Sequence, residues 1–435
     1  MWLRLAAVAV LLLVLYLPVY AQAGLPPGPN LLSLDQAFAR VARAHPDLRL
    51  FDARQDMLLA ERDKAALHPA YAVGGELENV LGTGKVRGFE NAEATFTLAS
   101  VFERGGKFDA RRTLAQSRID ALAVQRESAR LDLLAETARR YLAMAAAKRQ
   151  GGLADFDIAQ RQRTVAGARQ RLQAGASPES VVLTAEAALA KAELERARAE
   201  QAFVSSRQHL AALWGERAPT FDIPAVDPLA LPRIAGAEAL AQMLERTPEL
   251  QQFADQQRIR EARLQLARSE ASADIDWSLG VRHVRNGNDR QGNDAGFVAG
   301  FSIPLGAASR AQPGIRAAEA ELAALSIERE VKDVSLYSTL AEAHGQYTVA
   351  QLEVARLGSD VLPKLAKAEA AAERAYRAGA ISYLEWAQLQ SERTAMRKQQ
   401  LEAALAAQRA LIELQRLTGQ SLVVEAVVPA QGNTP

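Results

Sequence analysis

Residues 295–306 read Ala-Gly-Phe-Val-Ala-Gly-Phe-Ser-Ile-Pro-Leu-Gly, and this stretch decides the fold. Up to Ile303, the larger apolar side chains on one side alternate with glycine, valine and serine on the other, which is the pattern of a β-strand with two different faces. Proline and glycine then end the strand. The motif Phe301-Ser302-Ile303 also occurs earlier, as Phe96-Thr97-Leu98. The same strand is therefore present twice in the chain.

The recurrence extends over most of the 435 residues. The matching motifs keep their order and nearly constant spacing, and they are His45-Pro46-Asp47-Leu48 with Thr247-Pro248-Glu249-Leu250, Ala174-Gly175-Ala176 with Ala378-Gly379-Ala380, and Leu213-Trp214-Gly215 with Leu417-Thr418-Gly419. One long unit in two copies indicates duplication of a large supersecondary unit and not a short-repeat solenoid.

This duplication predicts the domain organisation. A first repeat covers residues 24–220 and a second covers 237–419. A Pro-rich linker, 221–236, joins them midway along the molecule, and residues 420–435 form a C-terminal tail.

Each repeat contains one predicted β-hairpin, at residues 71–102 and 274–305. Strands of about ten residues cross a bilayer when they are tilted. The alternative is an ordinary hairpin packed on a soluble core, but no further strands are predicted that could complete a sandwich. The apolar faces are therefore predicted to face lipid, through Tyr71, Phe96, Trp277, Leu279, Phe297 and Phe301.

Four strands cannot close a barrel, and an open sheet edge cannot lie in lipid. Two copies of the chain would give about eight strands, whose interior is filled by side chains, whereas three copies give about twelve and leave a lumen. If the chain forms a conduit, a homotrimer is the smaller solution.

Helical spacing predicts the remainder of both repeats. The predicted helices of the first repeat are 34–67, 108–172 with a kink or local unwinding at Gly151-Gly152, and 178–214, and those of the second are 237–271, 313–376 and 383–417. A helix of about 65 residues is about 97 Å long. Two short helices placed end to end match that length, so the predicted fold is mainly α with a small β part and has the shape of a rod.

The N-terminus has the features of an export signal. Arg4 precedes the apolar run Leu5–Val19, and Ala21-Gln22-Ala23 provides small residues for cleavage, which predicts a signal peptide at residues 1–23. A transmembrane helix is the alternative, but the run contains Pro18 and is shorter than the roughly 20 residues that a span needs.

Composition argues against several kinds of site. The chain has no cysteine, which excludes disulfides and thiolate chemistry, and its formal charge of +1 gives no reason to expect nucleic acid as a partner. Its five histidines never occur at metal-ligand spacing. We therefore expect no catalytic residue, no metal site and no cofactor, and predict that the protein is not an enzyme.

Two turns separate the long helices from the helices that follow. Gly175 and Gly379 occupy positions where a left-handed backbone ends a helix. Ser177-Pro178 predicts a new helix with serine as N-cap and proline at the first helical position. Ser382 and Glu385 have the spacing of a capping box.

At this point the sequence resembles the TolC-type outer membrane efflux proteins. The resemblance covers nearly the whole mature chain and rests on the duplicated hairpins, the junctions Glu103–Lys107 and Phe301–Gly306, and the turns Arg171–Ser177 and Tyr376–Ser382. The stretch Asp274–Arg282 is most similar to the CzcC-type members, which serve heavy-metal efflux pumps.

The resemblance implies a trimeric channel-tunnel, with a β-barrel of about 12 strands on a long α-helical barrel. Such a channel is a passive duct in the outer membrane that extends into the periplasm. It docks on a periplasmic adaptor protein and an inner-membrane pump of the resistance-nodulation-division (RND) class. The implied cargo is heavy-metal cations of the cobalt, zinc and cadmium type. Drug efflux, type I protein secretion and an exported structural coiled coil are the alternatives.

The resemblance also assigns site residues. The adaptor-docking tips would be Leu172, Gly175, Ala176, Ser177, Ala378, Gly379, Ala380 and Ser382. Glu385 matches an acidic position that lines the closed tunnel entrance, and Gln388 lies where relatives often have a second acid. The capping box explains Glu385 equally well, and the two roles are compatible.

Overall fold

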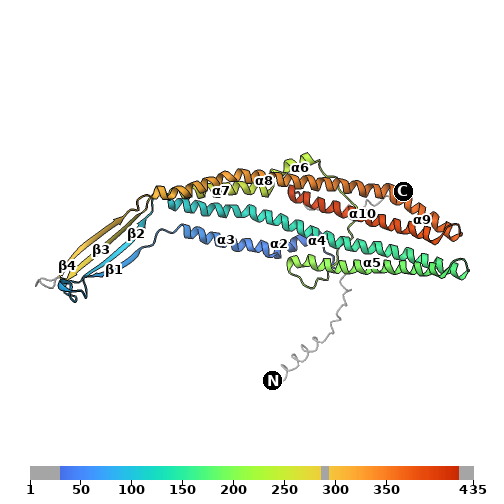
Figure 1. Cartoon of the computed structure of the whole chain (residues 1–435), viewed down its shortest axis with the longest axis horizontal. Coiled ribbons are helices and arrows are strands. Elements are labelled where there is room, and N and C mark those ends of the chain that lie inside the picture. Colours follow the sequence, from blue (N-terminus) through green and yellow to red (C-terminus); the bar gives the residue numbers. More distant parts are fainter. Residues whose placement is uncertain (1–29, 286–292, 421–435) are drawn as a thin grey trace, which may run out of the picture.

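The computed structural model describes residues 30–285 and 293–420 as a long rod, with a small sheet at one end and helix turns at the other (Figure 1). The predicted signal peptide and the tail from residue 421 onward lie outside the described residues. The helices are α2 Leu34–Ala44, α3 Pro46–Ala65, α4 Lys107–Gln173, α5 Glu179–Ala211, α6 Ala237–Leu244, α7 Pro248–Ser269, α8 Ala307–Arg356, α9 Leu362–Arg377 and α10 Tyr383–Thr418. The strands are β1 Ala72–Glu78, β2 Glu93–Phe102, β3 Ile275–Arg285 and β4 Asn293–Ser302. The predicted fold class, mainly α with a small β part, is confirmed.

The strands of the sheet and the helices next to them follow one another in the same order across the width of the rod. The antiparallel sheet has the order β1-β2-β3-β4, and next to it α3 packs on α4, α4 on α7, and α7 on α8. In the distal half α5 packs on α4, α4 on α10, and α10 on α8 and α9. One edge of the rod therefore carries β1, α3 and α5, and the opposite edge carries β4, α8 and α9 (Figure 1). No helix within the described ranges is long and apolar enough to cross a membrane.

The prediction of one continuous helix before each hairpin was wrong. The first is divided into α2 and α3 at His45, and the second into α6 and α7 around Thr247. Both residues precede a proline and are extended, with ψ of 130° and 146°. Proline disfavours the helical conformation of the residue before it and itself lacks an N–H, so each repeat breaks at the same position.

At Gly151-Gly152 the prediction of local unwinding was wrong, because α4 runs through both glycines as a helix of 67 residues, and a kink there stays a prediction. A Cβ on Gly151 would lie 4.0 Å from the Cβ of Ala199, an ordinary van der Waals contact, so the packing of α5 on α4 does not require glycine there. In the second repeat the matching long helix is interrupted, because the π-helical segment Leu357–Val361 separates α8 from α9. Pro363 in the first turn of α9 has no N–H for the helical ladder, and a wider π turn accommodates this loss.

Two further boundaries differ from the prediction. The strand β1 has 7 residues and ends at Glu78, so it is shorter than the predicted length of about ten residues, and Asn79 and Leu81, which follow it, have positive φ. The long helix of the second repeat begins at Ala307 and includes Pro313, which was expected to start it. Pro313 therefore lies inside the helix, beyond the first turn in which proline is tolerated without loss of a hydrogen bond.

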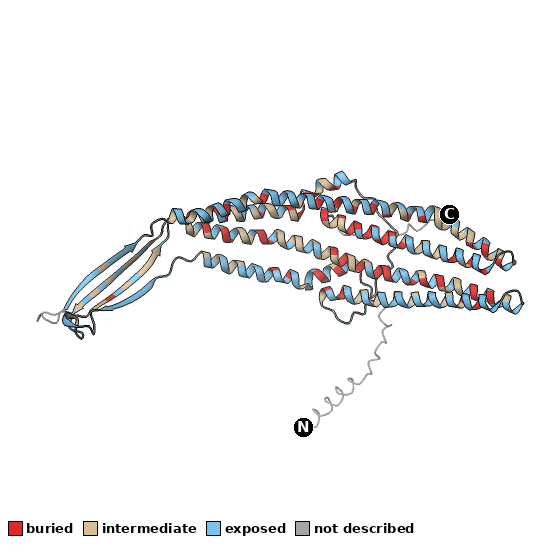
Figure 2. Ribbon diagram, in the orientation of Figure 1, coloured by how far each residue is buried: buried red, intermediate tan, exposed pale blue. Residues whose placement is uncertain are grey.

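The core is concentrated in the middle of the rod and at the distal tip, whereas the sheet is largely exposed (Figure 2). The linker 221–236 takes part in the middle core. Phe221 and Ile223 are buried against Tyr141 and Met144, and the backbone N–H of Leu32 donates to the Asp222 carbonyl at 2.7 Å. The Tyr347 hydroxyl donates to the Pro232 carbonyl. The linker is therefore a packed part of the fold.

A buried ion network joins three helices close to this core. Arg416 of α10 lies 3.0 Å from Asp132 of α4, 2.9 Å from Glu249 of α7 and 2.8 Å from Glu413. Arg139 of α4 lies 2.6 Å from Glu413. Burial would raise the pKa of Glu413, but the hydrogen bonds and charges of Arg416 and Arg139 outweigh it and lower this pKa below its ordinary value.

Candidate functional site

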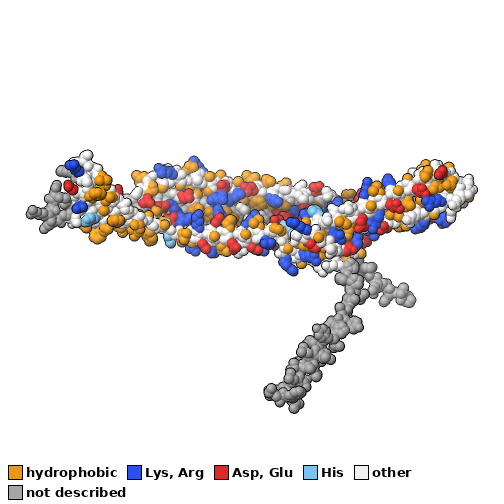
Figure 3. Space-filling view, turned by 90° about the horizontal axis from the view of Figure 1, so that it is seen from below, with side chains coloured by type: hydrophobic (Ala, Val, Ile, Leu, Met, Phe, Trp, Pro, Cys, Tyr) orange, Lys and Arg blue, Asp and Glu red, His pale blue; other side chains and the backbone are white. Residues whose placement is uncertain are grey.

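The sheet has one apolar face that no described part of the chain covers. Paired residues in an antiparallel sheet share a face. The register therefore places Phe96 with Val281, and Trp277 with Phe301, on the same side. Phe297 is 95% exposed and Phe301 80%. Figure 3 shows hydrophobic side chains gathered at this end, while charges of both signs cover the helices. An exposed apolar face with several aromatic side chains indicates contact with another apolar phase or partner.

All six residues predicted to face lipid lie on this side. Phe96, Trp277, Leu279, Phe297 and Phe301 follow from the register, and Tyr71, just before β1, packs edge-on against Trp277 at 6.2 Å. That the face contacts lipid stays a prediction.

The opposite face is small and polar. It carries Thr97, Ser278, Gly280, Gly300 and Ser302 in register. A Cβ at Gly280 would lie 2.4 Å from the Phe96 carbonyl oxygen, so no larger residue fits there. Towards the loop end, the Arg282 guanidinium lies 3.2 Å from Glu93 and 3.5 Å from Glu78. Apolar-out and polar-in alternation is the pattern of a membrane strand lining an aqueous lumen.

The two edges of the rod carry exposed seams at coiled-coil spacing. Their members recur at intervals of three and four residues and are exposed: Leu50, Ala53, Met57 and Ala60 on α3, Leu183, Ala187, Ala190, Leu194 and Ala197 on α5, and Ile327, Val331, Val334, Ser338 and Ala341 on α8. Such a repeat of apolar and small residues is the sequence of a helix that packs against another helix. No helix within residues 30–285 and 293–420 covers these faces, because α3 and α5 lie at one edge and α8 at the other.

The two predicted tip turns lie together at the end of the rod farthest from the sheet (Figure 1). Gly175 and Gly379 are left-handed, with φ of +71° and +78°. Ala176 donates its N–H to the Arg171 carbonyl, and Ala380 donates to the Ala375 carbonyl, both at 2.8 Å. This is the Schellman arrangement that ends a helix with a left-handed residue. Of the predicted docking residues, Leu172 belongs to the last turn of α4 and the other seven form the two turns.

The helices that leave the two turns start differently. Ser382 is the N-cap of α10, and its capping box with Glu385 is formed. In the first repeat the N-cap of α5 is Pro178, and no side chain caps the helix. The prediction that Ser177 is the N-cap was wrong by one residue, because Pro178 occupies the position that matches Ser382.

Glu385 and Gln388 are both exposed and lie one helical turn apart on α10. The Glu385 carboxylate accepts hydrogen bonds at 2.8 Å from the Ser382 N–H and from its hydroxyl. The Ser382 backbone bond, followed by the side-chain bond, lowers the pKa of Glu385. The cap role of Glu385 is thus visible, and its role at a tunnel entrance stays a prediction.

Sequence reasoning missed the aromatic cluster that joins the repeats behind the turns. Tyr376 stacks on Trp386 with 5.0 Å between ring centroids and contacts Tyr383 edge-on at 6.3 Å. Val165 and Val182 of the first repeat pack on this cluster. The available signal was three aromatic residues at helical spacing around one turn, which alone does not say what they pack against.

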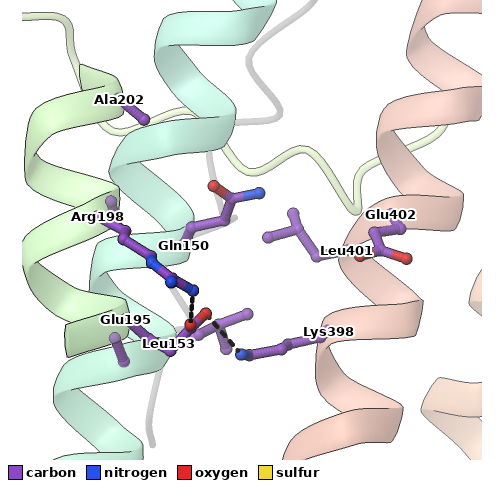
Figure 4. Close-up of a pocket in the computed structure, with 10 residues that line it drawn as sticks. Gln150, Leu153, Glu195, Arg198, Ala202, Lys398, Leu401 and Glu402 are labelled. Carbon is purple, nitrogen blue, oxygen red and sulfur yellow. Dashed lines mark hydrogen bonds and ion pairs between the residues drawn. The ribbon is translucent and has the colours of Figure 1, made fainter. Parts of the chain in front are cut away.

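Farther from the tips, a pocket of about 300 Å³ lies between α4, α5 and α10 (Figure 4). At its wall Glu195 of α5 accepts from Arg198 at 2.8 Å and from Lys398 of α10 at 3.3 Å, so it bridges the repeats. The hydrogen bond and charge of Lys398 lower the pKa of Glu195. Within residues 30–285 and 293–420, no group of three or more acidic or histidine side chains is placed to hold a metal ion.

Comparisons with known proteins agree with this architecture. The family model described as outer membrane efflux protein matches residues 40–216 and 239–420, one match in each repeat. The cobalt-zinc-cadmium resistance protein CzcC of Cupriavidus metallidurans is 28% identical over 283 residues, 65% of this chain and 66% of that protein. Protein CyaE of Bordetella pertussis is 32% identical over 225 residues, 50% of this chain and 46% of that protein. The chain thus spans just under two thirds and about half of the lengths of these relatives.

Among solved structures, CusC superposes with a TM-score of 0.73 at 17% identity, covering 89% of this chain and 92% of that chain. This likeness supports the fold, and the family matches cover both repeats. The resemblance inferred from the turns, junctions and hairpins is confirmed: the chain belongs to the outer membrane efflux protein family.

Proposed function

We propose that this chain is the outer membrane channel of a tripartite efflux system, a passive homotrimeric duct for heavy-metal cations of the cobalt, zinc and cadmium type. The observation that supports it most directly is the sheet with one apolar face, one small polar face and two unpaired edges, at the end of a rod of about 100 Å. A structural coiled coil without a lumen has no need of such a sheet.

The edges support a closed ring of identical chains. The strand edges β1 and β4 and the seams on α3 and α8 lie on opposite sides of the rod, so the surface on one side differs from that on the other. Different surfaces on opposite sides favour head-to-tail contacts that close into a ring. Three copies give about twelve strands, which is enough for a lumen.

The membrane and the partners follow from the two ends of the rod. The sheet end would lie in the outer membrane, reached through the signal peptide predicted at residues 1–23. The tip turns would meet the helical hairpins of a periplasmic adaptor, which connects the duct to an RND pump in the inner membrane. Energy and chemistry would then belong to the pump.

The substrate class rests on the similarity to CzcC, whose name refers to cobalt, zinc and cadmium resistance. The experiment is a deletion strain challenged with zinc, cobalt, cadmium, a panel of drugs and a secreted-protein assay. Loss of metal resistance that the intact gene restores is expected. If metal resistance is unchanged but drug resistance or protein secretion is lost, the proposed substrate class is wrong, and drugs or secreted proteins take its place.

Assembly is tested separately on detergent-extracted protein. Val334→Glu places a charge in the α8 seam and should shift the mass from trimer to monomer, whereas Ser335→Glu, an exposed neighbour outside the seam, should not. A monomeric wild-type mass, with unchanged circular dichroism, would contradict the homotrimer.

A further inference from the structure

One side chain links the two tip turns of the same chain. Arg171, in the last turn of α4, donates through Nη1 to the Tyr376 carbonyl and through Nη2 to the Ala176 carbonyl at 3.3 Å. Its guanidinium lies 4.8 Å from the centre of the Tyr376 ring. Ala176 belongs to the first turn, and Tyr376 lies in the last turn of α9, the helix that leads into the second turn. The guanidinium therefore binds the backbone of both.

The groups of the second repeat that surround the Arg171 side chain are held in place by packing. Tyr376 is 2% exposed, and its ring is held by Trp386. A Cβ added to Gly379 would lie 3.8 Å from the Arg171 guanidinium, so the second turn itself lies against it. An arginine that only complements the carbonyl end of its own helix would account for the bond to Ala176. It would not account for the bond and the ring contact to Tyr376.

Several hydrogen bonds join the two repeats in the distal half of the described chain. Those of Arg171 lie nearest to the tips. The next ones, Thr164 to Gln390 and Thr394 to Asp157, lie two or more helical turns farther from the turns. The position that matches Arg171 in the second repeat is Ala375, which has no donor. The side-chain donor of this link therefore comes from the first repeat alone.

We propose that Arg171 is a positioning residue that holds the two tip turns of one protomer as a single rigid docking surface. This inference rests on the proposed function, in which a helical hairpin of the adaptor packs on the turns. A partner that meets both turns gains affinity when their relative position is fixed before binding, because less ordering is then left to the binding step. Arginine suits this role, since a planar fork can reach two carbonyl oxygens and still stack on a ring.

The first test measures the turns without any partner. The chain has no cysteine, so Ala174→Cys and Ala378→Cys provide a unique pair of exposed sites for spin labels, one per turn. The label distance is measured in full-length protein diluted with unlabelled chain. Arg171→Gln should broaden the distance distribution, and Arg171→Lys should broaden it less. The matched control is Arg169→Gln, because Arg169 is exposed and pairs at 2.6 Å with Glu186 of its own repeat. An unchanged distribution in Arg171→Gln overturns the proposal.

The second test asks whether the fixed surface matters for export. Cells that carry Arg171→Gln should lose zinc resistance although the variant assembles with the wild-type mass and conducts in planar bilayers, while Arg169→Gln cells stay resistant. Full zinc resistance together with a broadened distribution would refute the docking role. If the wild-type gene itself gives no metal resistance, the proposed substrate fails, whereas the distance measurement still decides whether Arg171 fixes the turns.

Discussion

The two repeats are alike where each must fold by itself and different where they meet. Both break their first helix before a proline, and both end a long helix at a left-handed glycine. In contrast, Arg171 corresponds to Ala375, and Arg416 corresponds to Ala212. Local backbone requirements apply to each copy, so duplication preserves them. A contact between the copies needs only one donor, so either copy can lose it.

The largest effect should come from breaking the ion network at Arg416, its central arginine, which only the second repeat provides. Arg416→Ala leaves the carboxylates of Glu413 and Glu249 poorly exposed and without this cation, so we expect a loss of about 3 kcal/mol in unfolding free energy. Arg409→Ala, on the exposed face of the same helix, should change it by less than about 0.5 kcal/mol. The measurement is thermal unfolding in detergent, and equal effects would mean that the network adds no stability.

The same network predicts a pH dependence. The pKa of Glu413 is lower in the folded protein than the ordinary value of 4.5. A lowered carboxyl pKa contributes stability that is complete above the ordinary value and is lost as pH falls through the lowered one. The unfolding temperature of the wild type should therefore fall below about pH 4.5 more steeply than that of Glu413→Gln.

The next effect tests whether the two hairpins are equivalent in the membrane. Phe96 and Phe301 match in the two repeats and lie on the apolar face, although β2 is central and β4 is an edge in one chain. If the ring closes, β4 is no longer an edge, and arginine at either position should cost about 2 to 4 kcal/mol near the bilayer midplane.

The controls are Thr97→Arg and Ser302→Arg, which lie next to the two phenylalanines but on the opposite face. Folding into lipid vesicles and heat stability of the trimer on gels provide the measurements. We expect both controls to assemble. Equal tolerance on the two faces would show that the hairpins are not membrane strands.

Local patterns predicted most of the fold. Alternation identified the faces of the hairpins, and glycine identified both tip turns, because each of these signals lies within a few residues. The sequence also contains a signal for the helix breaks. His45-Pro46 and Thr247-Pro248 identify the repeat, and their prolines mark a helix boundary that the predicted continuous helices lack. Gly151-Gly152 suggested a local interruption of the helix, but α4 is helical through both residues.

The links between repeats could not be predicted from one sequence. Arg171 and Tyr376 are 205 residues apart, and Arg416 and Asp132 are 284 apart. A charged residue on a long amphipathic helix has the same local pattern whether it faces water or a partner across the fold. Only the lateral packing order of the helices distinguishes the two cases.

The smallest expected effect on stability concerns the difference between the two tip turns. Only the helix that follows the second turn starts with a capping box that contains an acidic residue. The residue that matches Glu385 in the first repeat is Val181. Ser382→Ala removes the cap and should cost about 1 kcal/mol of stability without altering ion selectivity.

Glu385→Gln keeps an oxygen that can accept the Ser382 bonds but removes the charge. If Glu385 lines the tunnel entrance, this variant should lose cation preference in reconstituted bilayers and stay as stable as the wild type.

The pH dependence separates the cap from the gate. The hydrogen bonds from Ser382 lower the pKa of Glu385, so the wild-type carboxylate keeps its charge until the pH falls below the ordinary value of 4.5 and through the lowered one. Cation preference should persist down to that range and then approach that of Glu385→Gln. Glu179→Gln, an exposed acid in the first turn of α5, is the matched control and should leave the preference unchanged. If Glu179→Gln and Glu385→Gln have the same effect, the entrance is not formed by the second repeat alone; if neither has an effect, Glu385 is only a helix cap.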